Sequence, residues 1–109
     1  AIAMAEAGAD LLVVHVGVTA LPSTGPLVSL SLDAAIDRVQ RVAAAGHGVN
    51  PELLILCHGG PFGEPDIVSA ALARMPQVAG FFGATTSERA PIERAVTERV
   101  SQFTELRLA

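Results

Sequence analysis

Hydrophobic residues are concentrated in three short, almost continuous runs, separated by stretches with helical spacing. The runs lie at residues 11–17, 53–58 and 78–83. Each has the length and apolar character of a parallel strand buried on both faces. Apolar positions then recur every three or four residues in stretches that begin near Leu32, Pro65 and Pro91, which predicts amphipathic helices. An alanine-rich helix over residues 1–7 precedes the first run.

Residues that start and stop helices fit these boundaries. Ser31 is a good N-cap for the helix that follows it, and Asp33 complements the dipole at its amino end. Gly46 is suited to ending this helix. Pro65 fits the first turn of the next helix, which we expect to end at Pro76.

The repeated order of strand, loop and helix predicts right-handed βαβ units and a parallel sheet. An open doubly wound sheet and a piece of a barrel both fit that pattern. Three strands cannot close a barrel, and a complete (β/α)8 domain needs about 250 residues. We expect an α/β fold, a partial (β/α)8 TIM barrel with three consecutive βα units. Residues 1–109 would be the C-terminal segment of a single barrel domain, and in isolation such a segment would self-associate through open strand edges.

Composition excludes several classes of partner. Of 109 residues, 50% are hydrophobic, but no apolar run reaches the roughly 20 residues of a membrane span. The net charge is −4, and the basic residues are scattered arginines, so neither nucleic acid nor an anionic membrane is an expected partner. The single cysteine, Cys57, allows no disulfide framework, which fits a cytoplasmic protein.

All three predicted strands end in polar or small residues followed by glycine. The three ends read His15-Val16-Gly17, Cys57-His58-Gly59-Gly60-Pro61 and Gly83-Ala84-Thr85-Thr86-Ser87-Glu88-Arg89. Ligands of α/β proteins bind outside the carboxyl ends of the strands. The strand beginnings carry no such residues, so we place the candidate site at the carboxyl ends.

Two histidines are the candidates for acid–base chemistry. His58 lies beside Gly59 and Gly60, whose N–H groups near a helix N-terminus suit a phosphate or carboxylate. The alternative is a turn that requires glycine conformations, with His58 bonded to the backbone. His15 either belongs to the site or is a core histidine with a hydrogen-bond partner.

The third strand end offers hydroxyl groups and charge. Its candidate ligand-binding residues are Gly83, Thr85, Thr86, Ser87, Glu88 and Arg89. Arg89 could fork onto a carboxylate or phosphate. Alternatively Ser87 caps the last helix, and Glu88 and Arg89 form a solvated pair of little energetic value.

Cys57 and His47 are expected to lie outside the site, whereas Glu64 could reach its rim. Cys57 and His58 are adjacent in one strand and point to opposite faces, so Cys57 is predicted to pack in the core. His47 follows Gly46 at the opposite end of the strands. Glu64 is not distinguished from an ordinary acid at a helix start. Two histidines without a nearby carboxylate are too few ligands for a metal ion, so we expect no metal ligands here.

Several blocks, in order, resemble the C-terminal part of the phosphoenolpyruvate hydrolase-like TIM-barrel family. They are residues 4–10, 15–19, 31–33, 56–61, 83–89 and 91–93. The CHGGP block at 57–61 and the GATTSER block at 83–89 are the most specific at their mutual spacing. The resemblance covers nearly the whole chain and implies that it holds strands six to eight of eight.

The resemblance also implies kinship with phosphoenolpyruvate and phosphonopyruvate hydrolases, which use a divalent metal such as magnesium held mainly by carboxylates of earlier strands. This chain would then contribute the anion-binding loops of a longer, homo-oligomeric enzyme with a small anionic substrate, and His58 and His15 would be catalytic. Alone it would be inactive. The alternative is a non-catalytic ligand-sensing or interaction domain, since family members also occur as domains of regulatory and plant antiviral proteins. The loop 20–28, glycine-rich in the family, here contains Pro22 and Pro26, so its shape is expected to differ.

Overall fold

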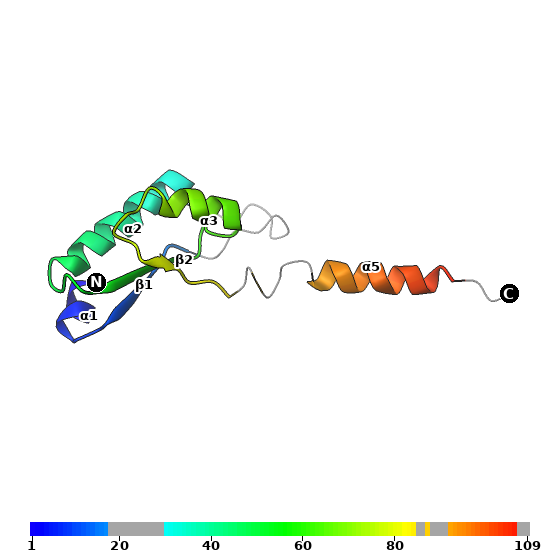
Figure 1. Ribbon diagram of the computed structural model, residues 1–109, viewed down its shortest axis with the longest axis horizontal. Coiled ribbons are helices and arrows are strands. Elements are labelled where there is room, and N and C mark those ends of the chain that lie inside the picture. The colour runs from blue at the N-terminus through cyan, green and yellow to red at the C-terminus, as the bar shows by residue number, and fades with distance from the viewer. Residues whose placement is uncertain (18–29, 85–86, 88–91, 107–109) are drawn as a thin grey trace.

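A computed structural model describes residues 1–17, 30–84, 87 and 92–106 of the chain (Figure 1). Helices and strands alternate along these residues. Their bounds are α1 Ile2–Glu6, β1 Leu11–His15, α2 Leu32–His47, β2 Leu54–His58, α3 Pro65–Leu72, β3 Gly80–Phe81 and α5 Ile92–Thr104.

The strands form one parallel sheet in the order β1-β2-β3. Leu11 pairs with Leu54 at the start of the ladder, and His15 pairs with His58 at its end. This confirms the predicted fold class, an α/β arrangement of successive βα units like an arc of a (β/α)8 barrel. Because the strands are parallel, their carboxyl ends meet at one edge of the sheet.

Alternation along the strands gives the sheet one buried face in the described part of the chain. Val14, Ile55 and Cys57 are buried towards α2 and α3, which lie on the same side of the sheet (Figure 1). The alternate residues of each strand point to the opposite face of the sheet, where Leu11 and Leu54 are 46% and 52% exposed. The expectation of strands buried on both faces is therefore met on one face only, since both long helices of the compact part pack on that face.

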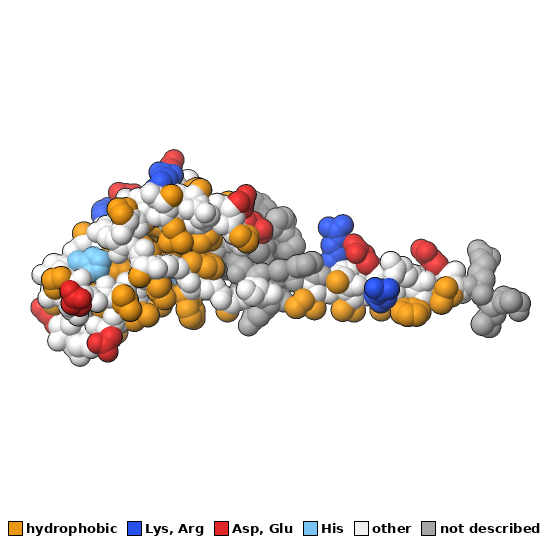
Figure 2. All heavy atoms as spheres, viewed as in Figure 1, with side chains coloured by type: hydrophobic (Ala, Val, Ile, Leu, Met, Phe, Trp, Pro, Cys, Tyr) orange, Lys and Arg blue, Asp and Glu red, His pale blue; other side chains and the backbone are white. Residues whose placement is uncertain are grey.

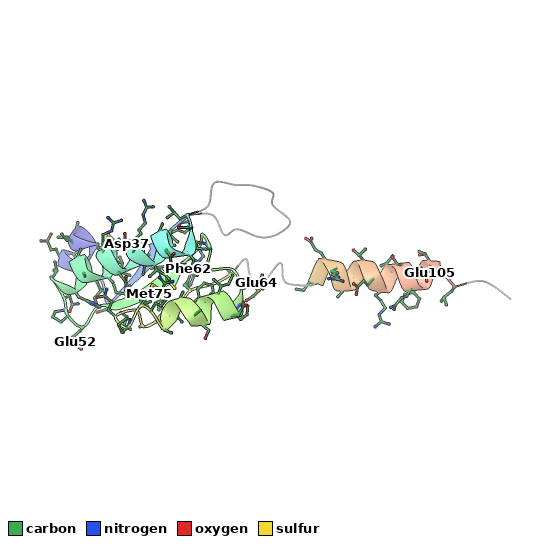
Figure 3. The ribbon with its side chains drawn as sticks, turned by 90° about the horizontal axis from the view of Figure 1, so that it is seen from above. Asp37, Glu52, Phe62, Glu64, Met75 and Glu105 are labelled. Carbon is green, nitrogen blue, oxygen red and sulfur yellow. The ribbon has the colours of Figure 1, made fainter. Side chains whose placement is uncertain are left out.

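Most of the core lies between this face and the helices. Its largest fully buried side chains are Phe62, Ile55, Met75, Val39 and Cys57. Figure 3 shows Phe62 and Met75 within the compact part of the chain. The helix that starts at Pro65 was expected to end at Pro76, but α3 already ends at Leu72, and Met75 is buried from the turn that follows.

Capping at α2 is as predicted at the start and different at the end. The Ser31 hydroxyl accepts a hydrogen bond from the Ala34 N–H at 3.2 Å. Gly46, however, does not end the helix, which continues to His47. Gly46 is buried, and a Cβ there would lie 2.8 Å from Cδ2 of Leu53. Its function is close packing of α2 against the chain entering β2.

The third strand is shorter than the run 78–83 predicts. Ala79 N–H donates to the Ile55 carbonyl, and Phe82 N–H donates to the Cys57 carbonyl. The acceptors are two residues apart and the donors three, so one extra residue shifts the register and interrupts the regular ladder. Only Gly80–Phe81 therefore forms β3, although the chain stays beside β2 as far as Phe82.

α5 confirms the predicted last helix but buries none of its residues. Its apolar stripe consists of Ile92, Val96, Val100 and Phe103, each more than half exposed. Figure 2 shows hydrophobic side chains gathered along one side of this helix. Among the described helices, none combines the length and the hydrophobicity that crossing a membrane requires.

Candidate functional site

The structure brings His15 and His58 together at the carboxyl ends of β1 and β2. They are direct partners in the ladder, so both side chains leave the sheet on its open face. Their ring centroids are 4.9 Å apart, with an interplanar angle of 62°. The Phe82 ring lies edge-on to His58 at 5.3 Å. Groups from all three strand ends therefore meet at one place.

Each imidazole is held by a backbone group through its Nδ1 atom. The Gly17 N–H donates to Nδ1 of His15 at 3.2 Å. Nδ1 of His58 lies 2.6 Å from the Phe82 carbonyl oxygen, to which it donates. Phe82 was not among the predicted site residues, because its carbonyl reaches His58 only through the register between β2 and the third strand end.

The loops after β1 and β2 pack closely enough to require glycine. Gly17, Gly59 and Gly60 have φ angles of 121°, 77° and 57°, which favour glycine. The Gly60 N–H donates to the Gly17 carbonyl at 2.9 Å. A Cβ on Gly59 would overlap that same carbonyl oxygen. These glycines thus position the two histidines, and direct contact of Gly59 or Gly60 with a ligand stays a prediction.

The amino end of α3 follows Gly59 and Gly60 along the chain, after a short turn. The helix starts at Pro65, and Glu64 precedes it at the N-cap position (Figure 3). The Glu64 carboxylate is exposed and makes no capping hydrogen bond. Binding of an anion by Gly59, Gly60 and this helix terminus stays a prediction.

The predicted residues of the third strand end are only partly described. Gly83 and Ser87 are both exposed, and the Ser87 N–H donates to the Ala84 carbonyl at 2.9 Å. Gly83 directly follows Phe82, whose carbonyl bonds to His58. Thr85, Thr86, Glu88 and Arg89 lie outside the described residues.

Cys57 and His47 are placed away from the histidine pair. Cys57 is fully buried on the helix-covered face, and burial raises the pKa of its thiol. It packs in the core, as its alternation with His58 predicts. His47 donates from Nε2 to the Leu53 carbonyl at 2.8 Å, at the amino end of β2. Neither side chain is available to a ligand at the strand carboxyl ends.

The described residues do not fit the magnesium ion that the family resemblance implies. Within that part of the chain no group of three or more His, Cys, Asp or Glu side chains could hold a metal. The strand ends offer two imidazoles, whereas magnesium prefers oxygen ligands in octahedral geometry. We therefore derive no step through magnesium from these residues.

The profile of the phosphoenolpyruvate hydrolase-like family matches residues 1–106. Two tomato (Solanum lycopersicum) proteins are similar over 103 residues, which is 94% of this chain. The ToMV susceptible protein tm-1(GCR26) is 45% identical, and the ToMV resistance protein Tm-1(GCR237) is 44% identical. The aligned part covers 14% of each relative. The chain thus spans about one seventh of the length of these curated relatives.

Proposed function

The chain belongs to the phosphoenolpyruvate hydrolase-like family, and on that premise we propose that it supplies ligand-binding loops of a barrel enzyme. The substrate would be a small anion of the phosphoenolpyruvate or 2-oxo acid type. The observation that carries this proposal is the meeting of His15 and His58, 4.9 Å apart, at the carboxyl ends of neighbouring parallel strands. Barrel enzymes place their catalytic groups at that end of the strands.

The histidines, the glycines after β2 and the polar residues of the third strand end have distinct parts in the proposal. His58 and His15 face the substrate from the ends of β2 and β1, and Gly59 and Gly60 shape the loop that carries His58. Arg89, with Thr85, Thr86 and Ser87, would bind the phosphate or carboxylate of the substrate. Paired carboxylates on other strands of the longer protein would hold a divalent metal. We also propose that this longer protein is a homo-oligomer and that the 109-residue chain alone is inactive.

Calorimetric titration of the full-length protein tests the proposal. Phosphoenolpyruvate and phosphonopyruvate would be titrated with and without magnesium into the wild type, His58→Ala and Arg89→Ala. Arg99→Ala, on the exposed surface of α5, is the matched control for the loss of an arginine. We expect metal-dependent binding that is lost in the first two variants and kept in the control. Absence of binding to a well-folded wild type contradicts the proposal.

A second function is favoured by the relatives themselves. Both are named for susceptibility or resistance to ToMV, and neither name refers to a reaction. A domain that senses a ligand or binds another protein could keep the histidine pair without catalysis. The two functions differ at the ends of the other strands. Paired carboxylates there favour catalysis, and their absence favours sensing.

A further inference from the structure

The two histidines have opposite hydrogen-bonding roles that are fixed by their backbone partners. An amide N–H can only donate, so the bond from Gly17 leaves Nδ1 of His15 unprotonated. A carbonyl oxygen can only accept, so the bond to Phe82 requires a proton on Nδ1 of His58. In the neutral imidazoles the remaining hydrogen of His15 is therefore on Nε2, whereas Nε2 of His58 carries a lone pair.

Both Nε2 atoms are free for a ligand as far as the described residues show. Within those residues no hydrogen bond to either atom is formed, and no buried side-chain nitrogen or oxygen lacks a partner. The His15 side chain is exposed and His58 is half-buried. The pair thus presents one N–H donor and one acceptor from rings whose centroids are 4.9 Å apart.

We propose that this pair binds an oxygen atom that carries a hydrogen, such as a water molecule or the hydroxyl of a 2-hydroxy acid, and that the two residues divide the work. His15 Nε2–H donates to the oxygen, and Nε2 of His58 accepts its proton. In the reacting complex the O–H bond breaks, the N–H bond forms on His58, and the electron pair stays on the oxygen. The Phe82 carbonyl keeps the ring oriented and accepts from the resulting imidazolium. This inference rests on the proposed function, because it assigns roles within the same site.

The same hydrogen bonds oppose a metal shared by the two rings. Coordination through Nε2 of His15 would move its proton to Nδ1, where it would face the N–H of Gly17. That rearrangement would cost the hydrogen bond and leave two donors opposed. A pair of histidines at adjacent strand ends therefore does not act as a zinc or nickel chelate here, although its spacing suggests one.

Nitrogen NMR of the full-length protein labelled with 15N-histidine tests the tautomers without any ligand. Signals would be assigned with His15→Gln and His58→Gln, at a pH where the imidazoles are neutral. We expect pyridine-type Nδ1 and pyrrole-type Nε2 shifts for His15, and the reverse for His58. The same tautomer at both residues overturns the division of roles. This readout stands even if phosphoenolpyruvate fails to bind, so it is separate from the test of the proposed function.

A pair of probes tests the ligand class. Lactate carries a hydroxyl, whereas 2-methoxypropionate carries an ether oxygen that cannot donate. We expect lactate to bind the wild type about tenfold more tightly, the effect of one hydrogen bond, and His58→Gln to reduce that preference. Equal binding of both probes, or no binding of lactate, overturns the proposed ligand class. Zinc titration supplies a further control, and zinc binding that is lost in both histidine variants would contradict the account.

Discussion

Substitution of Gly59 by alanine tests whether the loops after β1 and β2 are held together as the structure shows. The φ angle of Gly59 is 77°, and the left-handed conformation costs a non-glycine residue about 1–2 kcal/mol. The added Cβ would also overlap the Gly17 carbonyl oxygen. That atom belongs to the backbone and accepts from Gly60, so it cannot move freely, and such overpacking costs about 1–3 kcal/mol. We expect Gly59→Ala to lower the free energy of unfolding by about 2–5 kcal/mol.

Gly8→Ala is the matched control. Gly8 has a φ of 89°, but a Cβ there would meet nothing within 4 Å. It should therefore cost only the conformational part, about 1–2 kcal/mol. Urea unfolding of the full-length protein would give the difference between the variants, and hydrogen exchange of the Gly60 amide would report its bond to Gly17. Equal destabilisation by the two variants, with unchanged exchange at Gly60, would refute the packing described for these loops.

Four further predictions concern stability and association. Ile55→Ala should lower the free energy of unfolding by about 2–5 kcal/mol, since Ile55 is fully buried, whereas Glu52→Ala on the surface should change it by less than about 0.5 kcal/mol in the same urea titration. Ser31→Ala removes the cap bond to Ala34 and should cost about 1 kcal/mol, while Ser69→Ala on α3 serves as its control. The Cys57 thiol should resist a disulfide reagent until the protein unfolds. Burial raises the pKa of this thiol above its ordinary value of 9.0. The stability linked to the protonated thiol is therefore present below pH 9.0 and is lost as the pH rises through the raised pKa. Cys57→Ala should remove this fall of the free energy of unfolding at high pH. The isolated chain should self-associate in sedimentation velocity, and Val96→Glu with Val100→Glu on α5 should reduce the association; an unchanged distribution would exclude that stripe as the cause.

The order of elements and the location of the histidines could be predicted because they depend on local pattern. The runs at 11–17 and 53–58 are too short and too apolar for helices, and Ser31 and Pro65 mark helix starts through their own chemistry. Parallel strands then place His15 and His58 at the same edge of the sheet. Alternation within β2 was sufficient to separate Cys57 from His58.

Features that depend on contacts between distant segments could not be predicted. Gly46 resembles a helix stop, but its position is dictated by Leu53, seven residues later and on the chain entering β2. The shortening of β3 follows from an extra residue opposite Ile55 and Cys57, which no local pattern reveals. For the same reason the Phe82 carbonyl was not recognised as the partner of His58. Chemistry at the third strand end, including Arg89, stays a prediction.

The most direct test of the account is a crystal structure of the full-length protein with phosphonopyruvate. We predict that a water molecule beside the ligand, or a protonated oxygen of the ligand, lies within hydrogen-bonding distance of Nε2 of both His15 and His58. The Gly17 and Phe82 bonds to the two rings should remain as they are. A ligand bound at the strand carboxyl ends without contact to either ring, or bound elsewhere in the protein, would contradict the claim that this histidine pair is the functional centre of the chain.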